Sequence, residues 1–324
     1  MNASTSDGDL ALLAGLYSSA RETLGRFVVG NEDLIELIFV CLLSGGHMLI
    51  EGVPGTAKTT VAKTVARISG SEFRRVQCAV DTQPADIVGV RIFDQKQQDF
   101  VLKKGPIFTN ILLIDEINRL NPKTQSAFIE IMSERQATID GITLDLPSPF
   151  FVIATQNPFE FEGTFPLIEA QKDRFMFSAP AGHLTRDQEL EIVRRVHTGA
   201  LNWEEYYHWL PDILDDLTID RLVGMIDRIR MEEPVLQYIT DLVMATRAHG
   251  DVRLGASSRA SIALVRGGKA AAALRNRAYV IPDDIKRLAP AVLSHRLLLE
   301  REAEISGITP HRVVQEILET VEVP

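Results

Sequence analysis

The sequence predicts an α/β domain built on a parallel sheet, followed by an all-helical domain. Three observations lead to this fold. Short apolar runs alternate with helical patterns through the first half of the chain. After about residue 184 only helical periodicity remains. The 324 residues suffice for about two domains. We therefore expect an α/β core over 1–183 and a helical domain over 184–324.

The first elements are two helices, a strand and a third helix. Residues 11–30 have apolar positions at helical spacing and end at Gly30, and Asn31 suits the N-cap of a second helix. The strand "HMLIEG" follows at 47–52, and the next helix ends at Gly70. This order is the start of a layered α/β domain.

Further strands and helices complete the predicted core. The run "NILLIDE" (110–116) is apolar and ends in two acids, which is typical of a central strand of a parallel sheet. The dipeptide Asp140-Gly141 between two alternating runs predicts a hairpin. The other expected elements are a strand at 73–78, a β-ribbon insert with a short helical start at 84–105, a helix at 121–137 and a buried strand at 150–158.

The second domain is expected to consist of helices only. Each of its segments carries apolar residues at helical spacing. The expected helices lie within residues 185–199, 216–231, 233–250, 258–276, 282–297 and 309–321.

Composition and charge narrow the function classes. The formal net charge is −10, which disfavours a nucleic-acid binder, although Lys103-Lys104 leaves a local contact open. The longest apolar stretch, 34–50, is interrupted by polar residues and glycines, so we expect no membrane span. Cys41 and Cys78 are expected to be core residues, which fits a reducing cytoplasm.

Residues 51–60, "EGVPGTAKTT", resemble a phosphate-binding loop. Gly52, Lys58 and Thr59 match G-x-x-x-x-G-K-[ST], but Ala57 stands where the second Gly is expected. A strand precedes the loop and a helix follows it, as the motif requires. The alternative is a Gly/Pro turn before a helix that begins with Lys. The predicted nucleotide contacts are Gly52, Val53, Pro54, Gly55, Thr56, Ala57, Lys58, Thr59 and Thr60.

Each part of this loop has a physical role. Backbone N–H groups would surround a phosphate chain, and the positive end of the following helix would face it. Lys58 would reach the β- and γ-phosphates, and the Thr59 hydroxyl would bind Mg²⁺. We predict a right-handed backbone conformation for Ala57, because left-handed Ala costs about 1–2 kcal/mol.

Polar residues at two later strand ends complete the predicted site. Asp115 would hold Mg²⁺, mostly through water, and Glu116 would act as the general base on the attacking water. The alternative is that these acids cap the next helix. Asn157 would help to position the water, but Asn157-Pro158 is also a common turn.

The motifs "GVPGTAKT", "LLIDEINR", "ATQNP", "EAQKDRF" and "GASSRA" occur in this order, and together they resemble the MoxR branch of AAA+ ATPases, relatives of magnesium-chelatase small subunits. The resemblance covers about residues 27–298. It implies an AAA+ core with a helix-2 insert at 84–105, a pre-sensor hairpin at 135–146 and a helical lid.

The resemblance also implies roles for further residues. Arg174 would be an arginine finger that enters a neighbouring subunit's site, and Arg259 would be a sensor-2 residue that reaches the γ-phosphate of its own subunit. The alternatives are an ordinary salt bridge for Arg174 and a solvated first helical turn for Arg259. Val28, Val29 and Gly30 would pack on the adenine ring.

The expected function is that of a cytoplasmic, ATP-hydrolysing remodeller that requires Mg²⁺. The resemblance implies a ring, expected to be a hexamer, and a protein client, with a von Willebrand factor A domain protein as a partner. One alternative is a DNA-associated motor or loader. A P-loop GTPase is disfavoured because the guanine-reading Asn-Lys-x-Asp motif is absent, and a small-molecule kinase because it would not need a helical lid that carries "GASSRA".

Overall fold

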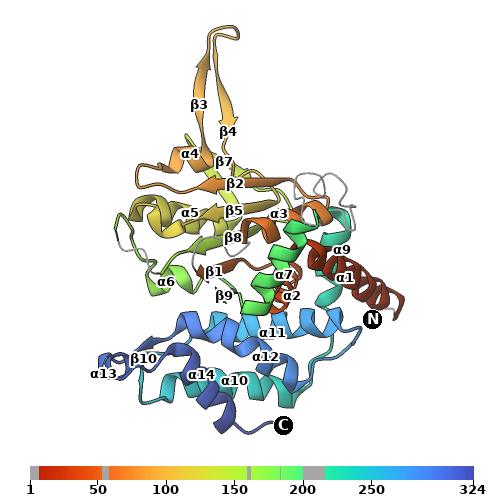
Figure 1. Cartoon of the computed structure of the whole chain (residues 1–324). Helices are drawn as coiled ribbons and strands as arrows, with labels where there is room; N and C mark the ends of the chain where they lie inside the picture. Colours follow the sequence, from red (N-terminus) through yellow and green to blue (C-terminus); the bar gives the residue numbers. More distant parts are fainter. Residues whose placement is uncertain (1–6, 53–57, 159–161, 183, 200–215) are drawn as a thin grey trace.

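A five-stranded parallel sheet forms the centre of the core (Figure 1). The computed structural model describes residues 7–52, 58–158, 162–182, 184–199 and 216–324. The strand order is β2-β5-β8-β1-β9, and every neighbouring pair is parallel. The strands are β1 (Met48–Gly52), β2 (Phe73–Gln77), β5 (Ile111–Asp115), β8 (Phe151–Gln156) and β9 (Phe177–Ala181). The predicted α/β class is confirmed.

Four of these strands were predicted, and β9 was not. Its sequence "FSAPA" contains Pro180, which removes a backbone donor and argues against a strand in the middle of a sheet. The strand forms because β9 lies at the edge of the sheet, where proline is tolerated.

Helices cover both faces of the sheet. Ile50 and Leu113 point to one face and Leu49 and Ile114 to the other, because side chains alternate along a strand. The first face packs on α1 (Asp7–Phe27), α2 (Glu32–Leu43) and α3 (Lys58–Ile68), and the second on α4 (Pro84–Val88) and α5 (Pro122–Glu134). Cys41 and Cys78 are buried and unpaired, as expected.

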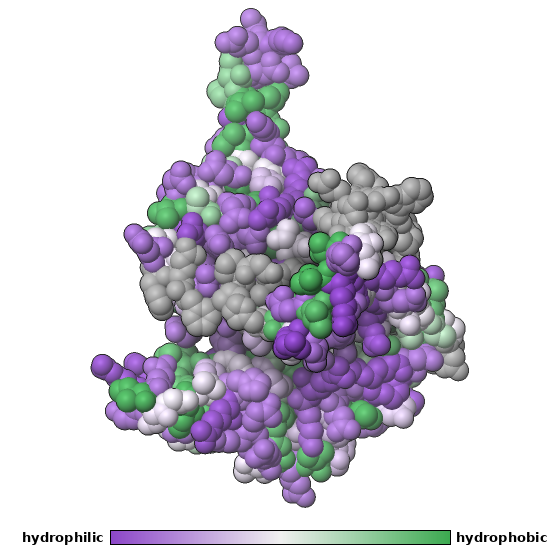
Figure 2. Space-filling model, viewed as in Figure 1, coloured by the Kyte–Doolittle hydropathy of each residue, from purple (hydrophilic) through white to green (hydrophobic). Residues whose placement is uncertain are grey.

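Both predicted hairpins are present. The ribbon β3 (Gly89–Asp94) and β4 (Asp99–Lys104) follows α4 and stands away from the body of the core (Figure 1). Figure 2 shows apolar surface along this ribbon and polar surface at its tip. The second hairpin, β6 (Gln136–Ile139) and β7 (Ile142–Asp145), turns at Asp140 and Gly141, which both have positive φ. Positive φ at both positions is what a tight two-residue hairpin turn requires.

The C-terminal part is helical, with one correction. A short antiparallel pair, β10 (Val252–Leu254) and β11 (Leu298–Leu299), joins two of its loops. Strands of two or three residues are too short to produce a periodic sequence pattern, so they were not predicted. The helices after the core sheet are α7 (Arg186–His197), α9 (Asp216–Ile226), α10 (Glu233–Ala248), α11 (Ser258–Leu274), α12 (Pro282–Leu293), α13 (Arg301–Ile305) and α14 (Pro310–Thr320).

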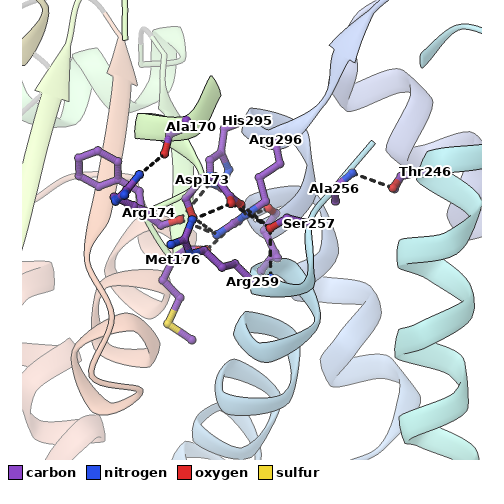
Figure 3. Close-up of polar contacts among 12 residues, drawn as sticks. Ala170, Asp173, Arg174, Met176, Thr246, Ala256, Ser257, Arg259, His295 and Arg296 are labelled. Carbon is purple, nitrogen blue, oxygen red and sulfur yellow. Dashed lines mark hydrogen bonds and ion pairs between the residues drawn. The ribbon is translucent and has the colours of Figure 1, made fainter. Parts of the chain in front are cut away.

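A buried ion pair joins the lid to the core. Arg296, in the 3₁₀ turn η2 (Ser294–Arg296), has a side chain that is only 2% exposed. Its Nε donates to Asp173 Oδ1 at 2.9 Å, and its Nη2 donates to the Phe175 carbonyl at 2.6 Å (Figure 3). Burial lowers the pKa of Arg296, and the Asp173 carboxylate opposes that shift. These partners therefore replace the contacts with water that the buried guanidinium has lost.

We expect Arg296→Met to destabilise the protein by about 3–5 kcal/mol, because it removes the buried cation that pairs with Asp173 and the donor to the Phe175 and Met176 carbonyls. Urea unfolding followed by circular dichroism measures this change. Arg312→Met is the matched control, since Arg312 is 65% exposed and pairs with the exposed Glu316; it should cost less than about 1 kcal/mol. Equal effects of the two substitutions would contradict a structural role for the buried pair.

Candidate functional site

Several predicted site residues lie at one edge of the sheet. Gly52 ends β1, Asp115 ends β5, and Asn157 directly follows β8. Because these strands are parallel and adjacent in the sheet, their carboxyl ends meet at one edge, where ligands bind in open α/β sheets. Residues Val53, Pro54, Gly55, Thr56 and Ala57 lie outside the described residues, and so does the prediction for the Ala57 backbone.

Lys58 anchors the start of α3 at this edge. It is 9% exposed, and its Nζ donates to the Gly52 carbonyl at 2.8 Å. Burial lowers the pKa of Lys58, while the nearby Asp115 and Glu116 carboxylates raise it. A Cβ on Gly52 would lie 2.1 Å from the Ala181 carbonyl oxygen, so only glycine fits there. Thr59 and Thr60 follow in the first turn of α3.

Asp115 is held by two donors. Thr155 Oγ1 donates to Asp115 Oδ1 at 3.0 Å, and Arg75 Nε donates to Oδ2 at 2.7 Å. The same Thr155 oxygen accepts the Glu116 backbone N–H at 2.9 Å. Thr155 therefore fixes both acids relative to β8. Sequence reasoning missed Thr155, although its place near the end of a buried strand, beside the acids of the neighbouring strand, was a usable signal.

The Glu116 carboxylate lies outside the sheet core and has polar neighbours. Its backbone is left-handed, with φ 59°. Gln77 Nε2 donates to Glu116 Oε2 at 3.1 Å, and Arg119 Nε lies 3.3 Å from the same oxygen. Non-glycine residues with positive φ are uncommon and occur at functional sites.

The residues at this edge fit a magnesium ion. Among the described residues, no group of three or more His, Cys, Asp or Glu side chains could hold a metal. Mg²⁺ commonly uses one or two carboxylates and completes its shell with phosphate oxygens and water. Here the Asp115 carboxylate already carries a cationic group, the Arg75 guanidinium, as a stand-in for a metal cation. Asp115 and the Thr59 hydroxyl are the side chains that would hold the ion.

Two other predicted contacts lie near the described part of this edge. The Asn157 carbonyl accepts a hydrogen bond from Asn118 Nδ2 at 3.3 Å, which ties the end of β8 to the segment after Glu116. Val28 is buried at the end of α1, and Gly30 has φ 72° and lies against Leu184 and Gln188. The segment 28–30 thus joins α1 to α2 and lies against the start of α7.

Arg174 and Arg259 lie together at the opposite edge of the sheet. They line a hollow of about 550 Å³ with Gly46 and His47, which directly precede β1. Lys58 lies beyond the other end of β1, and the five residues of this strand span roughly 16 Å. Arg259 Nη1 lies 3.2 Å from Asp173 Oδ2, and Arg174 Nη1 donates to the Ala170 carbonyl at 2.8 Å (Figure 3).

The position of Arg259 differs from the expected one. Arg259 was expected to reach a phosphate bound by its own subunit, but the structure brings it to Arg174 and Asp173 instead. The reason is the packing of the lid, because Asp173 binds Ser257 Oγ at the start of α11 as well as Arg296. Sequence reasoning also missed that Arg135, Arg266 and Arg296 line the same hollow. The hollow is rich in arginine although the chain is acidic overall.

Comparison with known proteins identifies two matching family models and several relatives. Residues 47–177 match the ATPase family associated with various cellular activities (AAA), and residues 244–317 match an AAA lid domain. The chain is 41% identical to the uncharacterized protein YeaC of Bacillus subtilis, over 95% of each chain. It is 40% identical to Chaperone MoxR1 of Mycobacterium tuberculosis, over 92% of this chain and 80% of that protein.

A solved structure supports the same relationship. A crystal structure from Cytophaga hutchinsonii, described as a candidate ATPase, has a TM-score of 0.89 and 37% identity, and the match covers 98% of this chain and 97% of that one. Protein MoxR of Methylorubrum extorquens is 29% identical over 98% of each chain.

Proposed function

Because the chain belongs to the MoxR family of AAA+ ATPases, we propose that it hydrolyses ATP with Mg²⁺ and uses the energy to remodel a protein client. The observation that carries this proposal is the meeting of Lys58, Asp115 and Glu116 at one edge of the sheet. A buried lysine at the start of a helix can bind the phosphates of a nucleoside triphosphate, and the two carboxylates beside it can bind the metal ion and activate water.

Different side chains of the chain have different roles in the proposed hydrolysis. Lys58 binds the β- and γ-phosphates, and its Nζ, which donates to the Gly52 carbonyl, is held at the edge of the sheet where they would lie. Glu116 accepts a proton from the attacking water, and the Asn157 side chain orients that water. When bound, Mg²⁺ would be held by Asp115 and Thr59 and would neutralise charge on the phosphates.

A neighbouring subunit supplies the rest of the site. Arg174 and Arg259 lie at the edge of the sheet opposite Lys58, so within one subunit they are far from the phosphates. In a ring, one subunit's arginine edge faces the next subunit's nucleotide edge. The two guanidiniums would then stabilise negative charge that develops on the γ-phosphoryl group. We propose a closed ring, with six subunits as the expected number.

The client is proposed to be a protein rather than a nucleic acid. One relative is named a chaperone, and the chain's net charge of −10 disfavours broad contact with phosphate backbones. A von Willebrand factor A domain protein is the expected partner. None of the helices in the part of the chain that the structure describes is long and apolar enough to cross a membrane. We place the protein in the cytoplasm.

Phosphate release from purified protein tests the enzymatic part of the proposal. We expect turnover with ATP that stops when EDTA removes Mg²⁺, and little turnover with GTP. Absence of ATP turnover from an assembled ring would overturn the proposal.

A pull-down with a Glu116→Gln variant, in the presence of ATP and of ADP, tests which partner the protein binds. An ATP-dependent protein partner supports remodelling, whereas ATP-dependent DNA binding with a steep salt dependence would favour the motor alternative.

A further inference from the structure

Arg75 contacts Oδ2 of Asp115, the residue that is proposed to bind the metal. It lies on edge strand β2, next to β5, with Gln77 opposite Asp115 in the parallel register. Arg75 is two residues before Gln77, so the two side chains share a face and the longer one reaches forward to Asp115. The Nε–Oδ2 distance is 2.7 Å. Thr155 donates to Oδ1, so both oxygens of the carboxylate already accept a hydrogen bond, and a second cation that approaches Oδ2 would compete with Arg75.

A second hydrogen bond holds Arg75 in this position. Its Nη2 donates to Gln77 Oε1 at 2.6 Å, and Gln77 Nε2 donates to Glu116 Oε2 at 3.1 Å. This orientation of the amide follows from chemistry, since a guanidinium only donates and a carboxylate only accepts. The hydrogen bonds therefore run continuously from Asp115 through Arg75 and Gln77 to Glu116.

Arg75 is more exposed to water than the carboxylate that it contacts. Its side chain is 44% exposed, whereas that of Asp115 is 10% exposed. An arginine at the surface can turn into water at little cost, because its ion pair is only partly desolvated. The carboxylate, by contrast, is largely buried and needs a cation or a donor.

We propose that Arg75 is a positioning residue that takes the place of the metal cation on Asp115 while no nucleotide is bound, and that Mg²⁺ must displace it. This inference rests on the proposed ATPase function. The guanidinium and Mg²⁺ compete for one oxygen, so Arg75 raises the Mg²⁺ concentration needed to form the metal–nucleotide complex. Its positive charge also offsets the negative charge of Asp115. Its departure removes the donor that positions Gln77 beside Glu116.

Calorimetric titration of AMP-PNP at a series of Mg²⁺ concentrations tests this inference without relying on turnover. Arg75→Gln should lower the Mg²⁺ concentration for half-maximal tight binding by about two- to fivefold, the range expected for removing a partly exposed ion pair. Arg74→Gln is the matched control. Arg74 is the neighbouring residue on the same strand, is similarly exposed at 42%, and pairs with Glu72 instead.

The outcomes separate the inference from the proposed function. A shift in Arg75→Gln with no shift in Arg74→Gln supports the inference. An unchanged Mg²⁺ dependence in folded Arg75→Gln, or an equal shift in both variants, overturns it while leaving the ATPase proposal standing. Wild-type protein whose nucleotide binding does not respond to Mg²⁺ would overturn both.

Discussion

Replacement of Glu116 by Gln is expected to leave ATP binding near normal and to slow hydrolysis by about 10²–10⁴-fold, the contribution of a general base. The amide has the same size as the carboxylate, but it cannot take a proton from water. The backbone at this position is held by the Glu116 N–H, which donates to Thr155, so the left-handed turn does not depend on the carboxylate. The chemical step should therefore change while the local structure persists.

Single-turnover hydrolysis and equilibrium nucleotide binding together measure this effect. Glu51→Gln is the control. Like Glu116, Glu51 lies at the carboxyl end of a core strand and accepts a hydrogen bond from a glutamine amide, here Gln156 Nε2 at 2.7 Å. Burial raises the pKa of Glu51, so loss of its charge perturbs the protein little. Hydrolysis by Glu116→Gln within a few-fold of wild type would rule out Glu116 as the base.

The sequence was most informative where local rules decide the structure. The buried run before Asp115 predicted a central strand, and Asp140-Gly141 predicted the turn of a hairpin. Each depends on residues within a few positions of one another. The same local logic predicted that Asp115 ends a strand at the edge where Lys58 begins a helix.

The position of the lid on the core depends on contacts between residues far apart in the sequence, and these could not be predicted. Asp173 and Arg296 are separated by 123 positions, and their contact fixes where the lid lies on the core. That contact, with Ser257 on the same carboxylate, determines the position of Arg259. No periodicity or motif spacing encodes such a pair. The residue Arg259 could therefore be singled out from the sequence, but its position beside Asp173 could not be predicted.

Replacement of Arg174 by Ala is expected to slow hydrolysis by about 10³-fold or more, as loss of an arginine finger does. The Arg174 Nε atom is buried without a hydrogen-bond partner among the described residues, and the side chain makes one bond, to the Ala170 carbonyl. Its removal should therefore alter the folded subunit little. A drop in turnover with unchanged thermal stability and ring assembly would separate a catalytic role from a structural one.

Mixed rings decide which subunit these arginines serve. Arg174→Ala subunits keep Glu116, and Glu116→Gln subunits keep Arg174, so some interfaces in a mixture contain both groups. With random 1:1 mixing about a quarter of the interfaces are complete, and activity well above that of either variant alone is expected. Arg259→Ala mixed with Glu116→Gln should recover in the same way, because Arg259 lies beside Arg174. Recovery with Arg174→Ala but not with Arg259→Ala would return Arg259 to its own subunit's phosphate, which would require the lid to move from its contact with Asp173.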